Sequence, residues 1–206
     1  MGNCHVDVTG CSLANNTAST SGGTLALWDP AVASAASLRR RHRRSRSLLQ
    51  LTNSGSISAA GITATQAIAD VYPVNSSAAS RFDASSSVFS FSLAEAGDGG
   101  AVWVYGATHA MLQGCSFGHS RAHSDGGAVA LAGVAAVVVL NTSVSRCRAV
   151  VGHGGGLSAV GSDQVVITGS DLSSNAAVQA GGVYIAPPSP LLSYSSAPAI
   201  LIHDTR

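Results

Sequence analysis

Pairs of adjacent glycines recur along this chain at a nearly constant interval. They stand at Gly22-Gly23, Gly99-Gly100, Gly126-Gly127, Gly154-Gly155 and Gly181-Gly182, and from residue 99 onward successive pairs lie 27, 28 and 27 residues apart. An interval of this length is typical of a chain built from equal structural units that stack on one another. The pattern therefore constrains the architecture far more than the chemistry.

Each unit also repeats one order of residue types. A stretch of alternating apolar and polar residues leads to an apolar anchor, a small or polar residue stands three positions later, and a polar loop leads to the glycine pair. Alternation is the period of a β-strand, and these stretches are too short and too β-branched for helices. The expected anchors are Leu13, Phe91, Phe117, Val144 and Leu172, and their partners are Asn16, Ala94, Ser120, Cys147 and Asn175.

The expected fold follows from the size of the unit. A unit of about 27 residues cannot bury its own apolar face, so each unit must stack on its neighbours with its strands paired in parallel, about 4.8 Å apart. With 46% apolar residues, mostly small, a narrow continuous core is possible. The sequence predicts an all-β fold, a right-handed parallel β-helix of about six to seven coils with an inserted arginine-rich loop.

The repeated steps carry a family resemblance. Leu13-Ala14-Asn15-Asn16 is followed by Gly22-Gly23-Thr24-Leu25, and Gly99-Gly100-Ala101-Val102 and Gly126-Gly127-Ala128-Val129 repeat the second step. These steps resemble the FxxN and GGA[ILV] repeats of chlamydial polymorphic outer membrane proteins, within the pectin-lyase-like β-helix superfamily. The resemblance covers residues 1–27 and about 86–206. It implies a surface-protein repeat and supports the expected fold.

The pattern is interrupted in two places. We expect residues 1–206 to be one β-helix domain, a fragment of a longer repeat protein preceded by a leader or further repeats. Within it we expect an inserted basic loop at 28–47, irregular coils at 48–98, regular coils at 99–185 and a Pro/Ser-rich loop at 186–198. Candidate strands inside the irregular region are 47–51 and 55–62.

Positive charge is concentrated in one short segment. The chain has no lysine, and six of its eleven arginines lie between Arg39 and Arg46, which leaves five arginines against ten acids elsewhere. This balance offers no general basic surface for nucleic acid. The segment is open to three interpretations: nuclear targeting, a basic processing site, or an exposed solvated loop. We favour an exposed loop that can be cleaved, ahead of a polyanion-binding patch.

Other features bear on location and on the state of the cysteines. No apolar stretch is long enough to cross a membrane, and residues 1–7 lack the features of a signal peptide. Four cysteines show no metal-ligand spacing, and Cys11 and Cys115 occupy equivalent places, so we expect buried thiols. The sequons at Asn15, Asn75 and Asn141 favour an extracellular or cell-surface location.

One column of residues is the candidate site. The residue before each glycine pair is Ser21, Asp98, Asp125, His153 and Ala180 in turn. Stacking would place two carboxylates and an imidazole about 5 Å apart. These groups could bind a hard cation, or they could act as acid and nucleophile in the cleavage of a glycoside. The alternative, which we favour, is that aspartate before glycine stabilises a turn through backbone amides.

A second string is less suggestive. His119, His123 and Asp125 have a spacing that brings two histidines together only on a helix, whereas here they fall in a loop. We therefore expect no metal site there, and no glycine-rich motif indicates a phosphate-bound cofactor.

Two functions remain open. The favoured one is a structural or adhesive repeat domain whose lateral faces bind glycans or surface proteins. The alternative is a polysaccharide lyase or glycoside hydrolase that uses Asp98, Asp125 and His153, because a fold alone does not decide function.

Overall fold

A computed structural model describes residues 5–28, 56–60, 63–64, 80–187 and 199–206. Within these ranges the regular elements are strands, and every pair of neighbouring strands is parallel. The all-β expectation is confirmed, as is the stacking of parallel sheets. The expected basic loop at 28–47 and the Pro/Ser-rich loop at 186–198 lie almost wholly outside the described residues, together with the candidate strand at 47–51.

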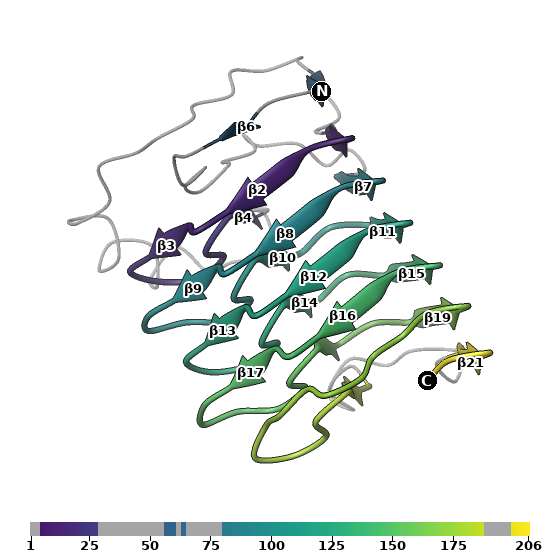
Figure 1. Cartoon of the computed structure of the whole chain (residues 1–206). Coiled ribbons are helices and arrows are strands. Elements are labelled where there is room, and N and C mark those ends of the chain that lie inside the picture. The colour runs from purple at the N-terminus through teal and green to yellow at the C-terminus, as the bar shows by residue number, and fades with distance from the viewer. Residues whose placement is uncertain (1–4, 29–55, 61–62, 65–79, 188–198) are drawn as a thin grey trace, which may run out of the picture.

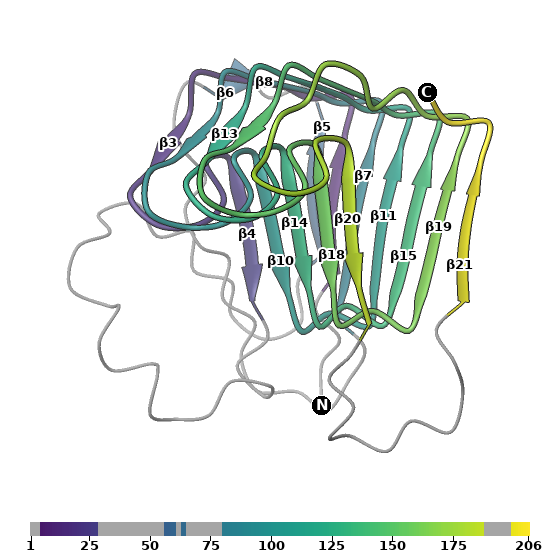
Figure 2. The same cartoon turned by 90° about the horizontal axis from the view of Figure 1, so that it is seen from below.

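Four sheets run side by side through the molecule, and we name each after its strand in the first unit. Their strand orders are β21-β19-β15-β11-β7-β1-β5 for the β1 sheet, β16-β12-β8-β2-β6 for the β2 sheet, β17-β13-β9-β3 for the β3 sheet and β20-β18-β14-β10-β4 for the β4 sheet. Equivalent strands of neighbouring units therefore lie one after another along the stack (Figure 1). The β1 and β4 sheets face each other across the interior (Figure 2).

Each of four complete units contributes one strand to each sheet, with similar lengths throughout. The first unit has β1 His5–Thr9, β2 Ser12–Ala14, β3 Thr17–Ala18 and β4 Leu25–Trp28. The later units have β7 Arg81–Ser85, β8 Val88–Ser90, β9 Leu93–Ala94 and β10 Val102–Tyr105; β11 His109–Gln113, β12 Ser116–Gly118, β13 Arg121–Ala122 and β14 Val129–Ala132; and β15 Ala136–Leu140, β16 Ser143–Ser145, β17 Arg148–Ala149 and β18 Leu157–Val160. The remaining strands are β5 Ser56–Ala60, β6 Thr63–Ala64, β19 Gln164–Thr168, β20 Val183–Ala186 and β21 Ala199–His203.

The units do not stack in chain order at the start of the molecule. Strand β1 lies between β5 and β7, and β4 pairs directly with β10. The described strand β5 therefore lies on the far side of β1 from β7, and not between them. Within the expected irregular coils at 48–98, residues 81–94 form the same three strands as the other complete units.

The glycine pair has two separate physical causes. The first glycine turns the chain with a positive φ, which is 65° at Gly99. The second glycine lies where neighbouring units touch, since a Cβ at Gly100 would stand 2.1 Å from the carbonyl oxygen of Gly127. A side chain at this second position is incompatible with the stacking distance, so glycine marks the contact between units.

The last unit is shifted by one residue from the sequence alignment. Gly154 N donates to Gln179 O, and His153 and Gln179 form a parallel bridge. Ala180 therefore occupies the place of the first glycine, and it has the same kind of positive φ, 55°. The expectation that Ala180 stacks on His153 is wrong: Gln179 does.

Inward-facing side chains of the four sheets form one continuous core. Val102 and Val104 of β10 and Phe82 and Ala84 of β7 belong to this core, and all are almost fully buried. Their equivalents in the other units are Val6, Val8, Leu112, Val129, Leu131, Val137, Val139, Leu157, Val165 and Ile167.

One of the expected anchors is wrong. Phe89, and not Phe91, stands in register with Leu13 and Phe117, and its ring stacks on that of Phe117 with centroids 4.7 Å apart. Phe91 is 56% exposed, because a positive φ of 53° turns its side chain outward. The small residue three positions after the true anchor is Ser92, not Ala94.

A polar ladder, buried over most of its length, lines the corner after the β2 sheet. Asn175 Oδ1 accepts a hydrogen bond from Cys147 N at 2.9 Å, and Asn175 Nδ2 donates to Val144 O at 2.8 Å. Asn16, Ser92 and Ser120 hold the equivalent places and are buried. These bonds satisfy backbone groups that the corner leaves outside the strand ladders.

Candidate functional site

The column before the glycine pairs brings its polar residues onto neighbouring units. Gly22 N donates to Asp98 O, Gly99 N to Asp125 O and Gly126 N to His153 O. Asp98, Asp125 and His153 therefore follow one another along the loops that lead into the β4 sheet. These loops are partly open to solvent, since the side chains of Asp125 and His153 are about one-third exposed.

The side chains of this column bind main-chain amides of the next unit. Asp98 N donates to Ser21 Oγ at 3.1 Å, Asp125 N donates to Asp98 Oδ1 at 3.1 Å, and His153 N donates to Asp125 Oδ1 at 2.7 Å. Each oxygen thus tethers the loop above it to the loop below. The sequence favoured turn stabilisation within one loop, whereas the structure joins successive units.

His153 has further contacts. Its Nδ1 lies 3.0 Å from Asp125 Oδ1, and its ring stacks on the ring of Tyr184 with centroids 4.5 Å apart. A carboxylate beside one imidazole nitrogen fixes the ring and its tautomer, as in catalytic His-Asp pairs. Here the same oxygen also accepts a hydrogen bond from the main-chain amide of His153. The pair therefore belongs mainly to the contact that joins successive loops.

His119 and His123 are not part of this column. His119 and His123 are both exposed, and the ring of His119 stacks on Phe91 with centroids 4.7 Å apart and planes 13° from parallel. Over the described ranges, no group of three or more His, Cys, Asp or Glu side chains is arranged to hold a metal ion.

A charged cluster that the sequence analysis missed lies on the outer face of the β1 sheet. Asp83 Oδ2 lies 2.8 Å from His5 Nε2 and accepts a hydrogen bond from Arg81 Nε at 2.5 Å. The side chain of Asp83 is only 10% exposed, and its Oδ1 has no hydrogen-bond partner among the described residues. A buried carboxylate oxygen without a donor is costly unless a ligand or proton satisfies it.

Register places a second carboxylate beside the first. Asp7 and Asp83 are partners on the neighbouring parallel strands β1 and β7, and Thr9 Oγ1 donates to Asp7 Oδ1 at 2.7 Å. The sequence carries a signal for this pairing, because His-Val-Asp-Val-Thr at residue 5 and Arg-Phe-Asp-Ala-Ser at residue 81 share one pattern. The pairing was missed because residues 81–85 were assigned to irregular coils.

The described cysteines are buried structural groups. Cys115 and Cys147 are free thiols, and Cys11 is buried in the corner equivalent to that of Cys115, as the sequence suggested. Desolvation by burial raises the pKa of Cys115, and it raises the pKa of Cys147 to about 11. A thiol with a raised pKa is protonated at neutral pH and is a poor nucleophile.

Two of the three sequons can be placed. Asn15 and Asn141 are both exposed and have positive φ at the corners that flank the β2 sheet. The third, Asn75, lies outside the described residues.

Comparisons of the chain with protein-family models, with curated proteins and with solved structures give no match. In the part of the chain that the structure describes, no helix is long and apolar enough to span a membrane.

Proposed function

We propose that the chain is a right-handed parallel β-helix of about six to seven coils that serves as a structural and adhesive repeat domain. Its place would be in an extracellular or cell-surface protein, where its lateral faces bind glycans or other proteins. The resemblance to polymorphic outer membrane protein repeats and the exposed sequons at Asn15 and Asn141 support this location.

One observation carries the proposal. The register of the parallel sheets repeats every outward position at the strand spacing, about 4.8 Å, so outward side chains form straight columns along the stack. A rigid array of regularly spaced groups suits an extended partner with a repeating structure. The predicted column of Asp98, Asp125 and His153 is used to tether loops, which removes the strongest argument for catalysis at that place.

The test is a binding survey with the full chain. Immobilised protein would be exposed to neutral and charged polysaccharides and to intact cell surfaces, and bound material would be measured by biolayer interferometry. Saturable binding supports the adhesive function. Absence of binding to every glycan and every surface contradicts it.

Polysaccharide hydrolysis remains the second candidate because of Asp7 and Asp83. Neighbouring parallel strands are about 4.8 Å apart, close to the 5–5.5 Å between the two carboxyl groups of retaining glycosidases. One carboxylate would attack the anomeric carbon and the other would protonate the leaving oxygen. Release of reducing ends from a polymer, lost in Asp83→Asn but kept in Asp125→Asn, would establish this activity.

A further inference from the structure

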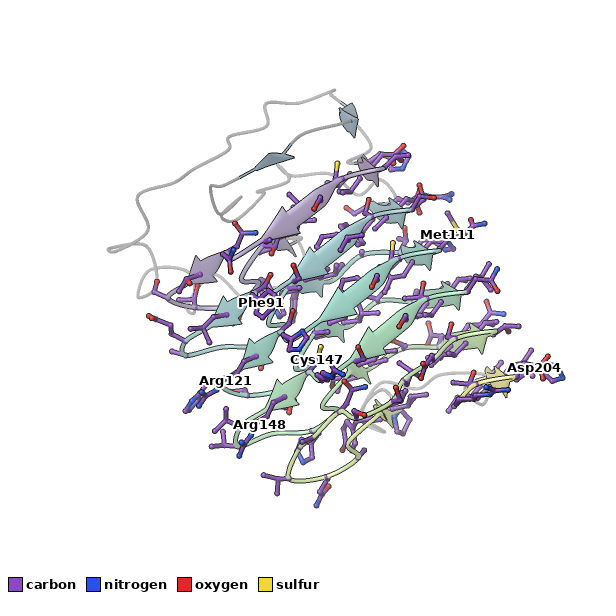
Figure 3. All side chains as sticks on the ribbon, in the orientation of Figure 1. Phe91, Met111, Arg121, Cys147, Arg148 and Asp204 are labelled. Atoms are coloured by element: carbon purple, nitrogen blue, oxygen red, sulfur yellow. The ribbon has the colours of Figure 1, made fainter. Side chains whose placement is uncertain are left out.

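Three arginines gather at one corner of the stack, where the β2 sheet leads into the β3 sheet. Arg121 of β13 and Arg148 of β17 are register partners on neighbouring parallel strands. Their side chains therefore leave the same face about 4.8 Å apart, and Figure 3 shows both at one edge of the molecule. Arg146 precedes Arg148 by two residues, and all three side chains are exposed.

The corner itself directs side chains into solvent. His119 N donates to Ser145 O, so His119 and Arg146 occupy equivalent places, and both have a φ of 55°. Phe91 stands at the same place one unit earlier and stacks on His119. We call His119, Arg121, Arg146 and Arg148 the basic ridge, with Phe91 at its end.

Among the described residues, no ion pair joins this ridge to an acid. The ion pairs found in the described ranges join Asp83, Asp125 and Asp204 to other partners. The positions in register with the ridge in the other units are also free of acids: Asn15, Thr17, Leu93, Ser174 and Ala176. The ridge is thus a site of concentrated positive charge that is open to an anionic partner.

We propose that the basic ridge binds a sulfated linear polysaccharide that lies along the stack. This inference rests on the adhesive function proposed above and names the chemical class of its ligand. Guanidinium groups pair with oxyanions through two parallel hydrogen bonds. A sulfate ester presents three terminal oxygens and can pair with both Arg121 and Arg148, which are register partners, whereas a planar carboxylate matches one guanidinium fork.

The surroundings of the ridge suit a sugar chain better than a nucleic acid. Ser116 and Ser143 are register partners on the adjoining β2 sheet and offer hydroxyl groups to sugar hydroxyls. The exposed ring of Phe91 offers a flat apolar surface to the C–H face of a sugar ring. Nucleic acid binding requires a wider basic surface. Outside residues 39–46 the chain has five arginines and ten acids.

The experiment measures binding of the full chain to heparin by titration calorimetry, at two salt concentrations. The test variant is Arg121→Gln with Arg148→Gln. The matched control is Arg40→Gln with Arg41→Gln, which removes the same charge from the arginine run. We expect the test variant to lose at least tenfold in affinity, which corresponds to about 1.4 kcal/mol, and the control to stay within twofold. Thermal unfolding of both variants shows whether they fold.

Each other outcome overturns the inference. Loss of binding in the control instead assigns the ligand to the arginine run. Tighter binding of polygalacturonate or of single-stranded DNA than of heparin assigns another anion. Should the wild type bind neutral glycans or surfaces but no heparin, the inference fails while the adhesive function stands. Should it bind nothing in either survey, the adhesive function itself fails.

Discussion

Asp125 holds His153 by two contacts to one oxygen: the main-chain N of His153 lies 2.7 Å from Asp125 Oδ1, and the imidazole Nδ1 lies 3.0 Å from it. The main-chain contact recurs one unit earlier, where Asp98 Oδ1 accepts a hydrogen bond from the amide of Asp125. These contacts cross from unit to unit, so they contribute to the cohesion of the stack.

Removal of the tether tests this role. We expect Asp125→Ala to lower the free energy of unfolding by about 1–3 kcal/mol, because it leaves the amide of His153 without its acceptor. Asp125→Asn keeps an acceptor oxygen and is expected to cost less. Urea denaturation measures both. Equal stability of Asp125→Ala and wild type would show that the contact is not structural.

The close contact between units predicts a contrast between two glycines. Gly100→Ala places a Cβ 2.1 Å from Gly127 O, whereas a Cβ at Gly10 meets nothing within 4 Å. Only Gly10 of these two glycines has a positive φ, 62°. We expect Gly10→Ala to cost about 1–2 kcal/mol from backbone conformation alone. We expect Gly100→Ala to cost more than Gly10→Ala, because its Cβ overlaps the backbone of the neighbouring unit and overpacks the stack. Similar losses in the two variants would contradict the account of the glycine pair.

Ala180 offers a change in the opposite direction. It occupies a left-handed conformation that glycine holds in every other unit with a glycine pair. We expect Ala180→Gly to stabilise the protein by about 1 kcal/mol, because the conformational penalty of a Cβ is removed. A fall in the melting temperature would argue for the alignment on Gly181-Gly182 instead.

Two phenylalanines two residues apart should behave very differently. Phe89 is fully buried against Phe117, while Phe91 is largely exposed. We expect Phe89→Ala to cost about 3–5 kcal/mol, and Phe91→Ala to stay within about 0.5 kcal/mol. Denaturant titration of the pair measures this, and the reverse order would restore Phe91 as the anchor.

The buried thiol of Cys147 makes stability depend on pH in the alkaline range. Its pKa rises from 9.0 to about 11 on folding because burial disfavours the thiolate. The folded state then keeps a proton that the unfolded state loses. Stability from this group is therefore complete below pH 9 and is lost as the pH rises to 11. The pH slope should be reduced in Cys147→Ala, and an unchanged slope would contradict the burial of the thiol.

The sequence predicted the repeated unit well because each glycine pair is required by the close contact between neighbouring units. Gly100 touches Gly127 O in any stack with this spacing, so the glycine pairs report the contact directly. Phe91 was predicted as the buried anchor in place of Phe89, because alternation places both residues on one face of a strand. Only the positive φ at the corner separates them.

The order in which the units stack could not be predicted from the sequence, because pairing between distant segments produces no local sequence pattern. An interval of 77 residues between Gly22 and Gly99 fits three stacked units by length, yet Gly23 N donates directly to Gly99 O. The cluster around Asp83 depends on this same pairing of β1 with β7. This cluster could not be predicted from the sequence without knowing that register.

The most direct test of the stack is a cross-link between Ser12 of β2 and Val88 of β8, which are outward-facing register partners. Neighbouring parallel strands lie within the Cα separation of 4.4–6.8 Å that a disulfide requires. We predict that Ser12→Cys with Val88→Cys forms a disulfide under mild oxidation, and that Ser12→Cys with Ser116→Cys, two units apart, does not. Failure of the first pair, with the variant folded, would mean that another unit separates the two strands and would contradict the architecture.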